Sequence, residues 1–197
     1  MAPSGQPPAA GAPISAGARC PPAKSDTKPA ASEVSLEISP AGTGSCALLA
    51  RLHGLCFSEA WTQDAFASLL AKPGAFSFLA STEESGQPMP AGFALGRAGG
   101  GECEIVTLGV VPARRNVGTA TALLGAIVAR ARSLCIEDLL LEVAADNTAA
   151  LALYQSAAFI AVGRRKGYYR AAHHPVHEDG AHEDRVDAII MRRSLLP

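Results

Sequence analysis

The sequence predicts one α/β domain, residues 33–197, behind a disordered tail, residues 1–32. Three observations lead to this prediction. The tail is dominated by Ala, Pro, Gly and Ser and has no apolar periodicity. Alternating and short apolar runs begin near Val34 and are separated by glycine-rich turns, which is typical of strands. Beyond Ile105, segments with strand and helix patterns follow one another in turn, as in α/β domains.

The domain begins with a strand and two amphipathic helices. Residues 34–38 alternate between apolar and polar side chains, and Pro40 predicts the end of this strand. Leucines recur at helical spacing over residues 48–55, which predicts the first helix. Thr62 is the expected N-cap of the second helix, which ends before Pro73.

Three antiparallel strands are expected next, at Phe76 to Ala80, Ala91 to Leu95 and Glu104 to Val111. The turn between the first two contains Glu83-Glu84-Ser85-Gly86, and three consecutive glycines, residues 99–101, form the second turn. The short spacing between the strands favours hairpin connections.

The second half of the domain adds two helices and three strands. The helix from Gly118 to about Ser133 has its apolar residues at offsets of three and four. Residues 138–143 are almost wholly apolar, so we expect this strand to be covered on both faces. A helix from about Asn147 to Ala157 and two strands, Phe159 to Val162 and Asp187 to Met191, complete the domain.

Charge and cysteine content exclude several classes of function. Lys and Arg total 17 against 18 for Asp and Glu, so neither nucleic acid nor an acidic membrane is indicated as a partner. The five cysteines form no CxxC pair, which indicates reduced thiols. No apolar run has the length of a secretory signal or a membrane span. We therefore expect a cytoplasmic monomer.

The turn after the third antiparallel strand predicts an anion site. Residues 115–121 open the long helix, and the first turn of a helix presents free N–H groups at the positive end of its dipole. Gly118 lets a ligand approach the backbone, and Arg115 adds positive charge. The segment lacks the lysine of a Walker loop and the glycines of a dinucleotide fingerprint, so another pyrophosphate is expected. The pattern alone also fits an ordinary strand-to-helix turn.

This segment resembles the coenzyme A motif of the GNAT acyltransferases: Gln or Arg, two residues, Gly, one residue, then Gly or Ala. Arg115, Gly118 and Ala120 match it. The resemblance implies the GNAT fold, a mixed and mostly antiparallel central sheet flanked by helices. Two longer stretches are similar to the bacterial ribosomal-protein-alanine N-acetyltransferases, the RimI family: Leu141 to Phe159, and Arg164 to Tyr169 with Asp187 to Met191.

The resemblance implies acetyl-CoA as the acyl donor. In the family, the backbone at three strand residues holds the pantetheine, the loop that follows holds the pyrophosphate, and an asparagine contacts the cofactor. The expected cofactor-binding residues are Leu108, Gly109, Val110, Arg115, Asn116, Val117, Gly118, Thr119, Ala120, Thr121 and Asn147.

Glu142 and Tyr154 are the candidate base and acid. From spacing alone, Glu142 is equally a general base or a strand-end carboxylate that points to solvent. Tyr154 follows Asn147 by two helical turns, which suits a proton donor facing the thioester, although core packing is the commoner role of such a tyrosine. The resemblance assigns the base to Glu142 and the acid to Tyr154.

The expected reaction is acetylation of the N-terminal α-amine of a protein. An α-amine is about 2.5 pKa units easier to deprotonate than lysine, roughly 3.4 kcal/mol. The resemblance points to the N-terminal alanine of a small-subunit ribosomal protein. A lysine side chain or a small-molecule amine is the alternative substrate, and a non-catalytic coenzyme A-binding module is the alternative function.

Three features near the C-terminus need separate interpretations. Ala158 stands where the family usually has a left-handed glycine, at an expected cost of about 1 kcal/mol. Residues 171–185 form a longer loop than usual, rich in His and acidic residues, and we interpret it as solvated, with no metal. The basic run at residues 164–166 is interpreted as a solvated face or a peptide-binding rim.

Overall fold

The computed structural model describes residues 35–170 and 185–196; the predicted tail and most of the His-rich loop lie outside these residues. Short 3-10 turns stand at Thr43–Ser45 and Pro112–Arg114. The other elements are β1 (Leu36–Ala41), α1 (Cys46–Cys56), α2 (Gln63–Leu70), β2 (Ala75–Glu84), β3 (Gln87–Gly99), β4 (Glu102–Val110), α3 (Thr119–Ser133), β5 (Asp138–Ala144), α4 (Thr148–Ser156), β6 (Ile160–Arg170) and β7 (Arg185–Ser194).

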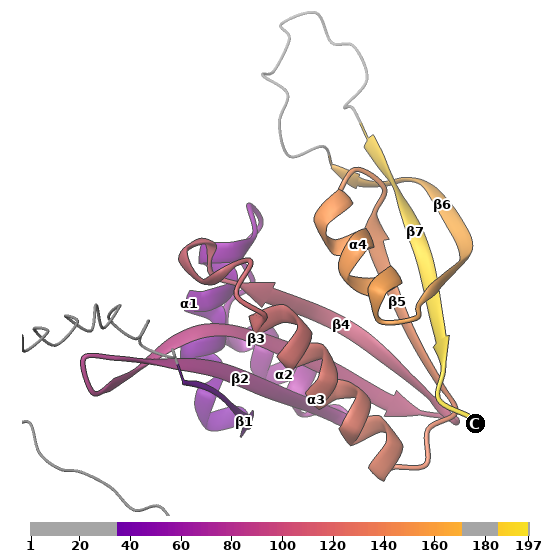
Figure 1. Cartoon of the computed structure of the whole chain (residues 1–197). Coiled ribbons are helices and arrows are strands. Elements are labelled where there is room, and N and C mark those ends of the chain that lie inside the picture. Colours follow the sequence, from indigo (N-terminus) through magenta and orange to yellow (C-terminus); the bar gives the residue numbers. More distant parts are fainter. Residues whose placement is uncertain (1–34, 171–184, 197) are drawn as a thin grey trace, which may run out of the picture. The chain divides into compact units, whose positions relative to one another are not determined.

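The described strands form one seven-stranded sheet in the order β1-β2-β3-β4-β5-β7-β6. Among them, β4 and β5 run parallel, and every other neighbouring pair is antiparallel. This confirms the predicted mixed, mostly antiparallel sheet with helices. Figure 1 shows β4 and β5 side by side near the C-terminus of the chain and apart at their opposite ends.

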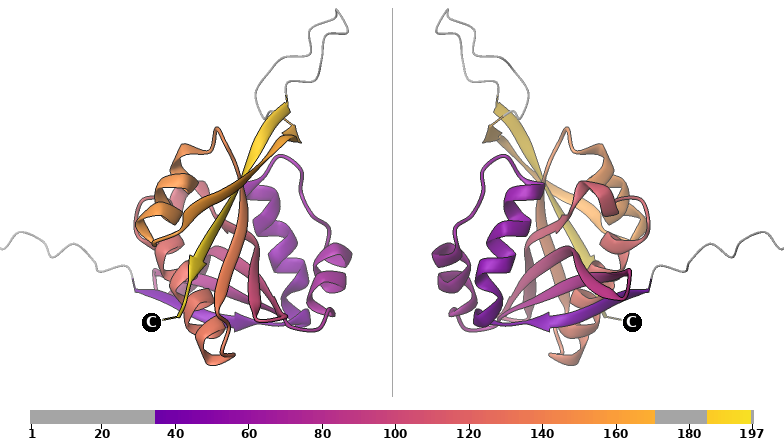
Figure 2. Two further views of the ribbon diagram at one scale, coloured as in Figure 1. Left: turned by 90° about the vertical axis from the view of Figure 1, so that its right-hand side faces the viewer. Right: turned by 90° about the vertical axis from the view of Figure 1, so that its left-hand side faces the viewer.

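Helices cover the two faces of the sheet unequally (Figure 2). On one face, α3 and α4 pack on a continuous core that includes Leu123, Ile127 and Leu139. On the other face, α1 and α2 pack on β2, β3 and β4 around Phe66 and Phe93. On this second face, α1 and α2 therefore cover the part of the sheet that β2, β3 and β4 form.

A bulge in β4 opens the sheet. The β3–β4 register shifts so that Leu95 faces Thr107 while Gly96 faces Ile105, which leaves Val106 as the extra residue. A β-bulge bends its strand. Pairing between β4 and β5 ends at Ile105 and Leu141, immediately before the bulge. Over residues 106–110, β4 therefore keeps β3 on one edge and has no paired strand among the described residues on the other.

Several sequence predictions differ from the structure; among them, β6 continues to Arg170, well beyond the predicted end of that strand at Val162. The first strand continues through Pro40 to Ala41, because β1 is an edge strand and Pro is tolerated there. The prediction that β5 is covered on both faces was wrong. Residues 139, 141 and 143 are buried, whereas Leu140 and Glu142 are half-buried and line a cavity, because α1 and α2 pack on other strands.

Two expectations are confirmed, one from the local sequence at Thr62 and one from the family resemblance at Ala158. The Thr62 hydroxyl accepts a hydrogen bond from the Ala65 N–H at 3.2 Å and caps α2. Ala158 has a φ of +62°, which confirms the left-handed position after α4. The Phe159 N–H donates to the Tyr154 carbonyl at 2.9 Å and closes this turn.

A buried histidine holds the segment between α1 and α2. His53 is 3% exposed, and its Nδ1 accepts a hydrogen bond from the Trp61 N–H at 3.2 Å. The rings of Phe57 and Trp61 stack on the imidazole, with centroids 4.3 and 4.7 Å away. Burial lowers the pKa of His53 to about 4.

We expect the protein to lose stability as the pH falls from about 6.5 toward about 4. In that window the unfolded chain binds a proton at His53 and the folded chain does not, so the full stability is present only above about pH 6.5. The loss reaches roughly 3 kcal/mol at pH 4. Unfolding midpoints of the wild type and His53→Phe should therefore converge on acidification, and parallel curves would contradict this role.

Candidate active site

The predicted pantetheine residues lie on the opened edge of β4. Leu108, Gly109 and Val110 pair with β3 and follow the bulge. Gly109 is needed for packing, because a Cβ there would lie 2.7 Å from the ring of Phe93 and 3.1 Å from that of Phe57. An extended ligand with amide groups can pair with such a strand edge as an added strand does.

The predicted anion loop lies at the start of α3. Gly118, at the N-cap, has a φ of +88°, and a Cβ there would meet nothing within 4 Å. No side chain of the described residues caps this helix, and the Ala122 N–H is the first to reach a carbonyl in it, that of Gly118 at 3.0 Å. The first turn thus presents N–H groups beside open space, as an anion site requires.

Two side chains shape the same loop. The Nε of Arg115 donates to the Val110 carbonyl at 3.1 Å, which holds the guanidinium at the end of β4. Thr119 is buried, and its hydroxyl donates to the Arg114 carbonyl at 3.2 Å. The other predicted loop residues, Asn116, Val117 and Thr121, are exposed, and Ala120 is half-buried.

Glu142 stands at the point where β4 and β5 separate. Its side chain is 24% exposed, and Oε1 lies 3.3 Å from the Nε of Arg165. The hydroxyl of Tyr169 donates to the Glu142 main-chain carbonyl at 3.4 Å. Because the Arg165 side chain is 55% exposed, this ion pair contributes only about 0–1 kcal/mol and a competing cation can replace it.

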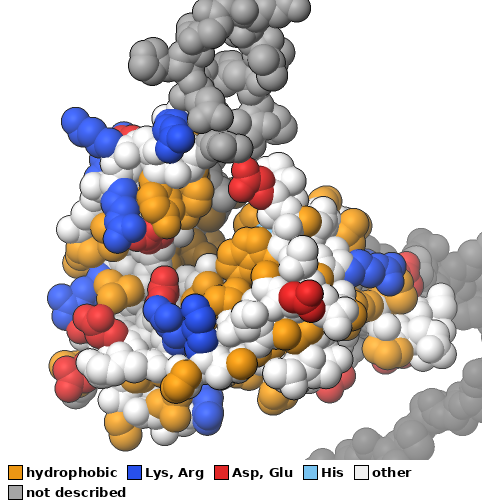
Figure 3. Space-filling model, turned by 180° about the vertical axis from the view of Figure 1, so that it is seen from behind, with side chains coloured by type: hydrophobic (Ala, Val, Ile, Leu, Met, Phe, Trp, Pro, Cys, Tyr) orange, Lys and Arg blue, Asp and Glu red, His pale blue; other side chains and the backbone are white. Residues whose placement is uncertain are grey.

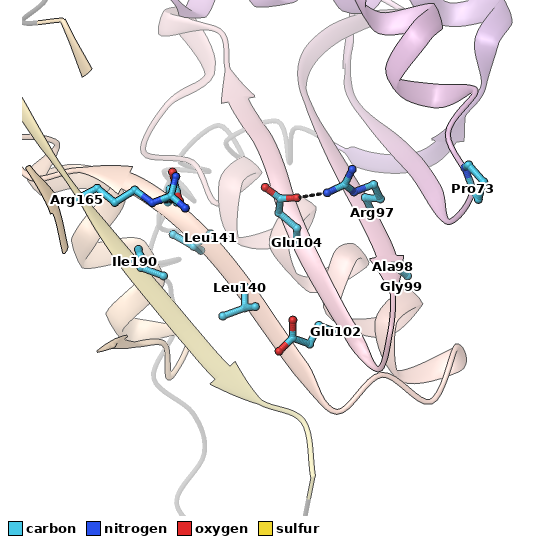
Figure 4. Close-up of a pocket in the computed structure, with 11 residues that line it drawn as sticks. Pro73, Arg97, Ala98, Gly99, Glu102, Glu104, Leu140, Leu141, Arg165 and Ile190 are labelled. Carbon is cyan, nitrogen blue, oxygen red and sulfur yellow. Dashed lines mark hydrogen bonds and ion pairs between the residues drawn. The ribbon is translucent and has the colours of Figure 1, made fainter. Parts of the chain in front are cut away.

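A cavity of about 550 Å³ begins at Glu142. It lies on the sheet face that α1 and α2 cover only in part, and Figure 3 shows this face hollowed between basic, acidic and hydrophobic side chains. Leu140, Leu141 and Ile190 form its apolar floor, and an ion pair of 2.9 Å between Arg97 and Glu104 forms one wall (Figure 4). The volume is in the usual range for a ligand site and suits a few residues of a peptide.

Tyr154 is buried on α4, on the other side of the sheet from this cavity. It is 8% exposed, and its ring meets that of Phe159 edge to face at 5.6 Å. Burial, with a smaller effect of Tyr169, raises the pKa of Tyr154 to about 12. Full proton transfer from this phenol to a thiolate with a pKa near 8.5 would be uphill by roughly 5 kcal/mol.

Asn147 is the N-cap of α4, one residue before the first helical residue. Its Oδ1 accepts a hydrogen bond from the Ala150 N–H at 3.1 Å. One lone pair of the side-chain oxygen is therefore used by the cap, and the amide nitrogen is the group of this side chain that can donate to a ligand.

The structure adds three residues that sequence reasoning left without a specific role. Arg165 was interpreted only as part of a solvated face or rim, and Tyr169 and Asp187 only as parts of the matched stretches. All three belong to the β6–β7 pair: Arg165 and Tyr169 contact Glu142, and Asp187 contacts the backbone between them. The one local signal in the sequence for this arrangement is Gly167, because a glycine within a strand pattern indicates a bulge.

Comparison with known proteins identifies the family. A family model described as "Acetyltransferase (GNAT) family" matches residues 36–159. The chain belongs to this GNAT family. It is 44% identical over 78 residues to the N-alpha-acetyltransferase RimI of Mycobacterium tuberculosis, a match covering 40% of this chain and 48% of that relative. The match thus spans about half the length of that protein.

Solved structures agree with this assignment. The ribosomal-protein-S18-alanine N-acetyltransferase from Escherichia coli superposes on this GNAT chain with a TM-score of 0.70 and 25% identity, covering 83% of this chain and 96% of its own. Arabidopsis thaliana NAA60 in complex with acetyl-CoA has a TM-score of 0.67 and 19% identity, covering 82% and 99%, which shows the shared fold.

Further findings from the described residues concern metal sites and membrane-spanning helices. Among residues 35–170 and 185–196, no group of three or more His, Cys, Asp or Glu side chains could hold a metal ion. The described helices include none that is long and apolar enough to cross a membrane. The four cysteines in the described residues are free thiols.

Proposed function

We propose that this GNAT protein transfers the acetyl group of acetyl-CoA to the N-terminal α-amine of a protein. The observation that carries the proposal is the position of Glu142. Its carboxylate lies where the opened edge of β4 meets the cavity on the sheet face under α1 and α2. A base in that position can accept a proton from an amine that enters through the cavity, while the acyl donor lies along the edge of β4.

The donor side is built from backbone groups. The N–H groups at the start of α3, together with Arg115, would hold the pyrophosphate, and the free edge of β4 over residues 108–110 would hold the pantetheine. Asn147 would add an amide contact. Acetyl-CoA supplies the activated acetyl group, and this placement brings it to the point where β4 and β5 separate.

Glu142 then acts on the acceptor. The incoming ammonium displaces Arg165 from the carboxylate, which is inexpensive because that ion pair is exposed. Glu142 takes one proton from the ammonium, directly or through water, so that the neutral amine attacks the thioester carbonyl. The second proton, which the nitrogen loses as the C–S bond breaks, goes to the released thiolate or to water. Tyr154 donates a hydrogen bond to the departing sulfur and keeps its own proton, because its pKa of about 12 is well above that of a thiol.

The nature of the amine follows from energetics and from the relatives. A single carboxylate suffices for an α-amine, whereas lysine is harder to deprotonate by roughly 3.4 kcal/mol. The Mycobacterium tuberculosis relative is described as an N-alpha-acetyltransferase, and the Escherichia coli structure as a ribosomal-protein-S18-alanine N-acetyltransferase. We therefore propose an N-terminal alanine, in a small-subunit ribosomal protein, as the acceptor.

Peptides with a free N-terminal alanine should be acetylated far faster than N-terminally blocked peptides that carry lysine. At neutral pH the neutral fraction of the α-amine is about 300 times greater. The measurement is mass spectrometry of a peptide panel incubated with acetyl-CoA, with Glu142→Gln protein as the control for uncatalysed acetylation. Faster modification of blocked lysine peptides or of polyamines would favour the alternative substrates, and no turnover at all would favour a binding module.

A further inference from the structure

Strand β6 is interrupted beside the candidate site. Its register against β7 shifts between Arg165 and Tyr169, and Gly167 within this bulge has a φ of +58°. The side chains that flank the bulge both reach Glu142: Arg165 meets the carboxylate at 3.3 Å, and the Tyr169 hydroxyl meets the main-chain carbonyl at 3.4 Å. The conformation of the bulge therefore decides where these two groups lie.

Asp187 on β7 holds this bulge. Its Oδ1 accepts a hydrogen bond from the Gly167 N–H at 2.7 Å, and its Oδ2 accepts one from the Nε of Arg164. These bonds hold the pKa of the Asp187 carboxyl below its usual value, the Gly167 N–H having the larger effect. The main-chain carbonyl of Asp187 also accepts from the Ala145 N–H at 2.8 Å, which ties β7 to the turn that leads into α4.

Aromatic contacts join the two sides of the bulge. The ring of Tyr168 meets that of Tyr169 edge to face at 5.0 Å, and the Arg165 guanidinium lies 5.5 Å from the Tyr168 ring centroid. A displacement of Gly167 would therefore move Arg165 and Tyr169 together. Nothing in these contacts reaches the α3 anion loop, so the affinity for acetyl-CoA should be unaffected.

We propose that Asp187 is a positioning residue for the acceptor side of the site: by holding the Gly167 N–H and Arg164, it sets Arg165 and Tyr169 against Glu142. The inference rests on the proposed function of Glu142. Of the two contacts, the one to Gly167 carries the role, because Arg164 is 61% exposed and its ion pair is screened by solvent.

Three variants separate the two contacts. Asp187→Ala removes both, Asp187→Asn keeps an oxygen that can accept the Gly167 N–H, and Arg164→Gln removes the ion pair alone. We expect Asp187→Ala to lower kcat/KM for the alanine peptide by at least about tenfold, with the acetyl-CoA dissociation constant unchanged. Asp187→Asn and Arg164→Gln should remain within about threefold of the wild type.

Hydrogen exchange at residues 166–169 gives a second readout, independent of turnover. Exchange should accelerate in Asp187→Ala and stay at the wild-type rate in Asp187→Asn. If the wild type acetylates no amine, the proposed function fails. Unchanged exchange in Asp187→Ala would separately overturn the proposal that Asp187 holds the Gly167 N–H.

Three further results would overturn the proposal. The first is a lower unfolding midpoint in Asp187→Ala with unchanged kcat/KM, which would mean a structural role alone. The second is an equal loss of acetyl-CoA affinity, which would place the effect on the whole sheet. The third is failure of Asp187→Asn to restore activity, which would show that the Gly167 contact is not responsible.

Discussion

Glu142→Gln should lower turnover at neutral pH by about 100-fold or more, while the affinity for acetyl-CoA stays nearly unchanged. The substitution keeps the shape of the side chain and removes the base. Glu142 lies at the end of the β4–β5 pairing and lines the cavity, whereas the anion loop is built from other residues. Steady-state kinetics and equilibrium binding measure the two quantities separately.

The pH dependence of this variant makes the test sharper. As the pH rises toward about 8, more of the α-amine arrives already neutral, so the deficit of Glu142→Gln should shrink up to that pH and change less beyond it. Glu137→Gln is the matched control: it makes the same chemical change at the exposed residue just before β5, away from the cavity lining. Wild-type turnover in Glu142→Gln would show that Glu142 is a strand-end carboxylate and no base.

Gly118→Glu should raise the acetyl-CoA dissociation constant by at least about tenfold, because it places a negative charge beside N–H groups that are proposed to bind pyrophosphate. A Cβ at Gly118 meets nothing within 4 Å, so the added side chain occupies the space open to the ligand. The left-handed φ of +88° adds a backbone strain of about 1 kcal/mol. Isothermal titration calorimetry measures the affinity directly.

Two variants separate charge from strain at this position. Gly118→Asn adds a side chain that tolerates a left-handed backbone and carries no charge, so it should weaken binding much less. Gly125→Glu adds the same charge at an exposed position further along α3, where a Cβ also meets nothing within 4 Å. Unchanged affinity in folded Gly118→Glu protein would refute the anion-site interpretation.

Much of the fold could be predicted because its signals are local. Helical spacing of apolar residues predicted α3 from Gly118 to Ser133, within one residue of its observed start. The cap at Thr62 is likewise a property of a few neighbouring residues, whereas the left-handed position of Ala158 was expected from the family resemblance. The strand end, glycine turn and helix start of the predicted anion loop are local in the same sense, because they are adjacent in the chain and therefore in space; anion binding by this loop stays a prediction.

The environment of Glu142 could not be predicted in this way. Its spacing allowed a base and a solvent-facing carboxylate equally, and only the packing of β6 beside β7 brings Arg165 and Tyr169 to it. The expectation that β5 is covered on both faces failed for a related reason. An apolar run shows that a strand is buried somewhere, but the reach of α1 and α2 across the sheet decides which side chains line a cavity.

By itself, the sequence determined the order of the elements, the caps and turns, and the resemblance that places the chain among the GNAT proteins. The tertiary structure alone decided the bulge at Val106, the resulting separation of β4 from β5, and the bond from Asp187 to Gly167. The physical reason is the range of the interactions. Capping and periodicity act within a few residues, whereas strand register and cross-strand hydrogen bonds join residues distant in the chain, and local composition does not specify that pairing.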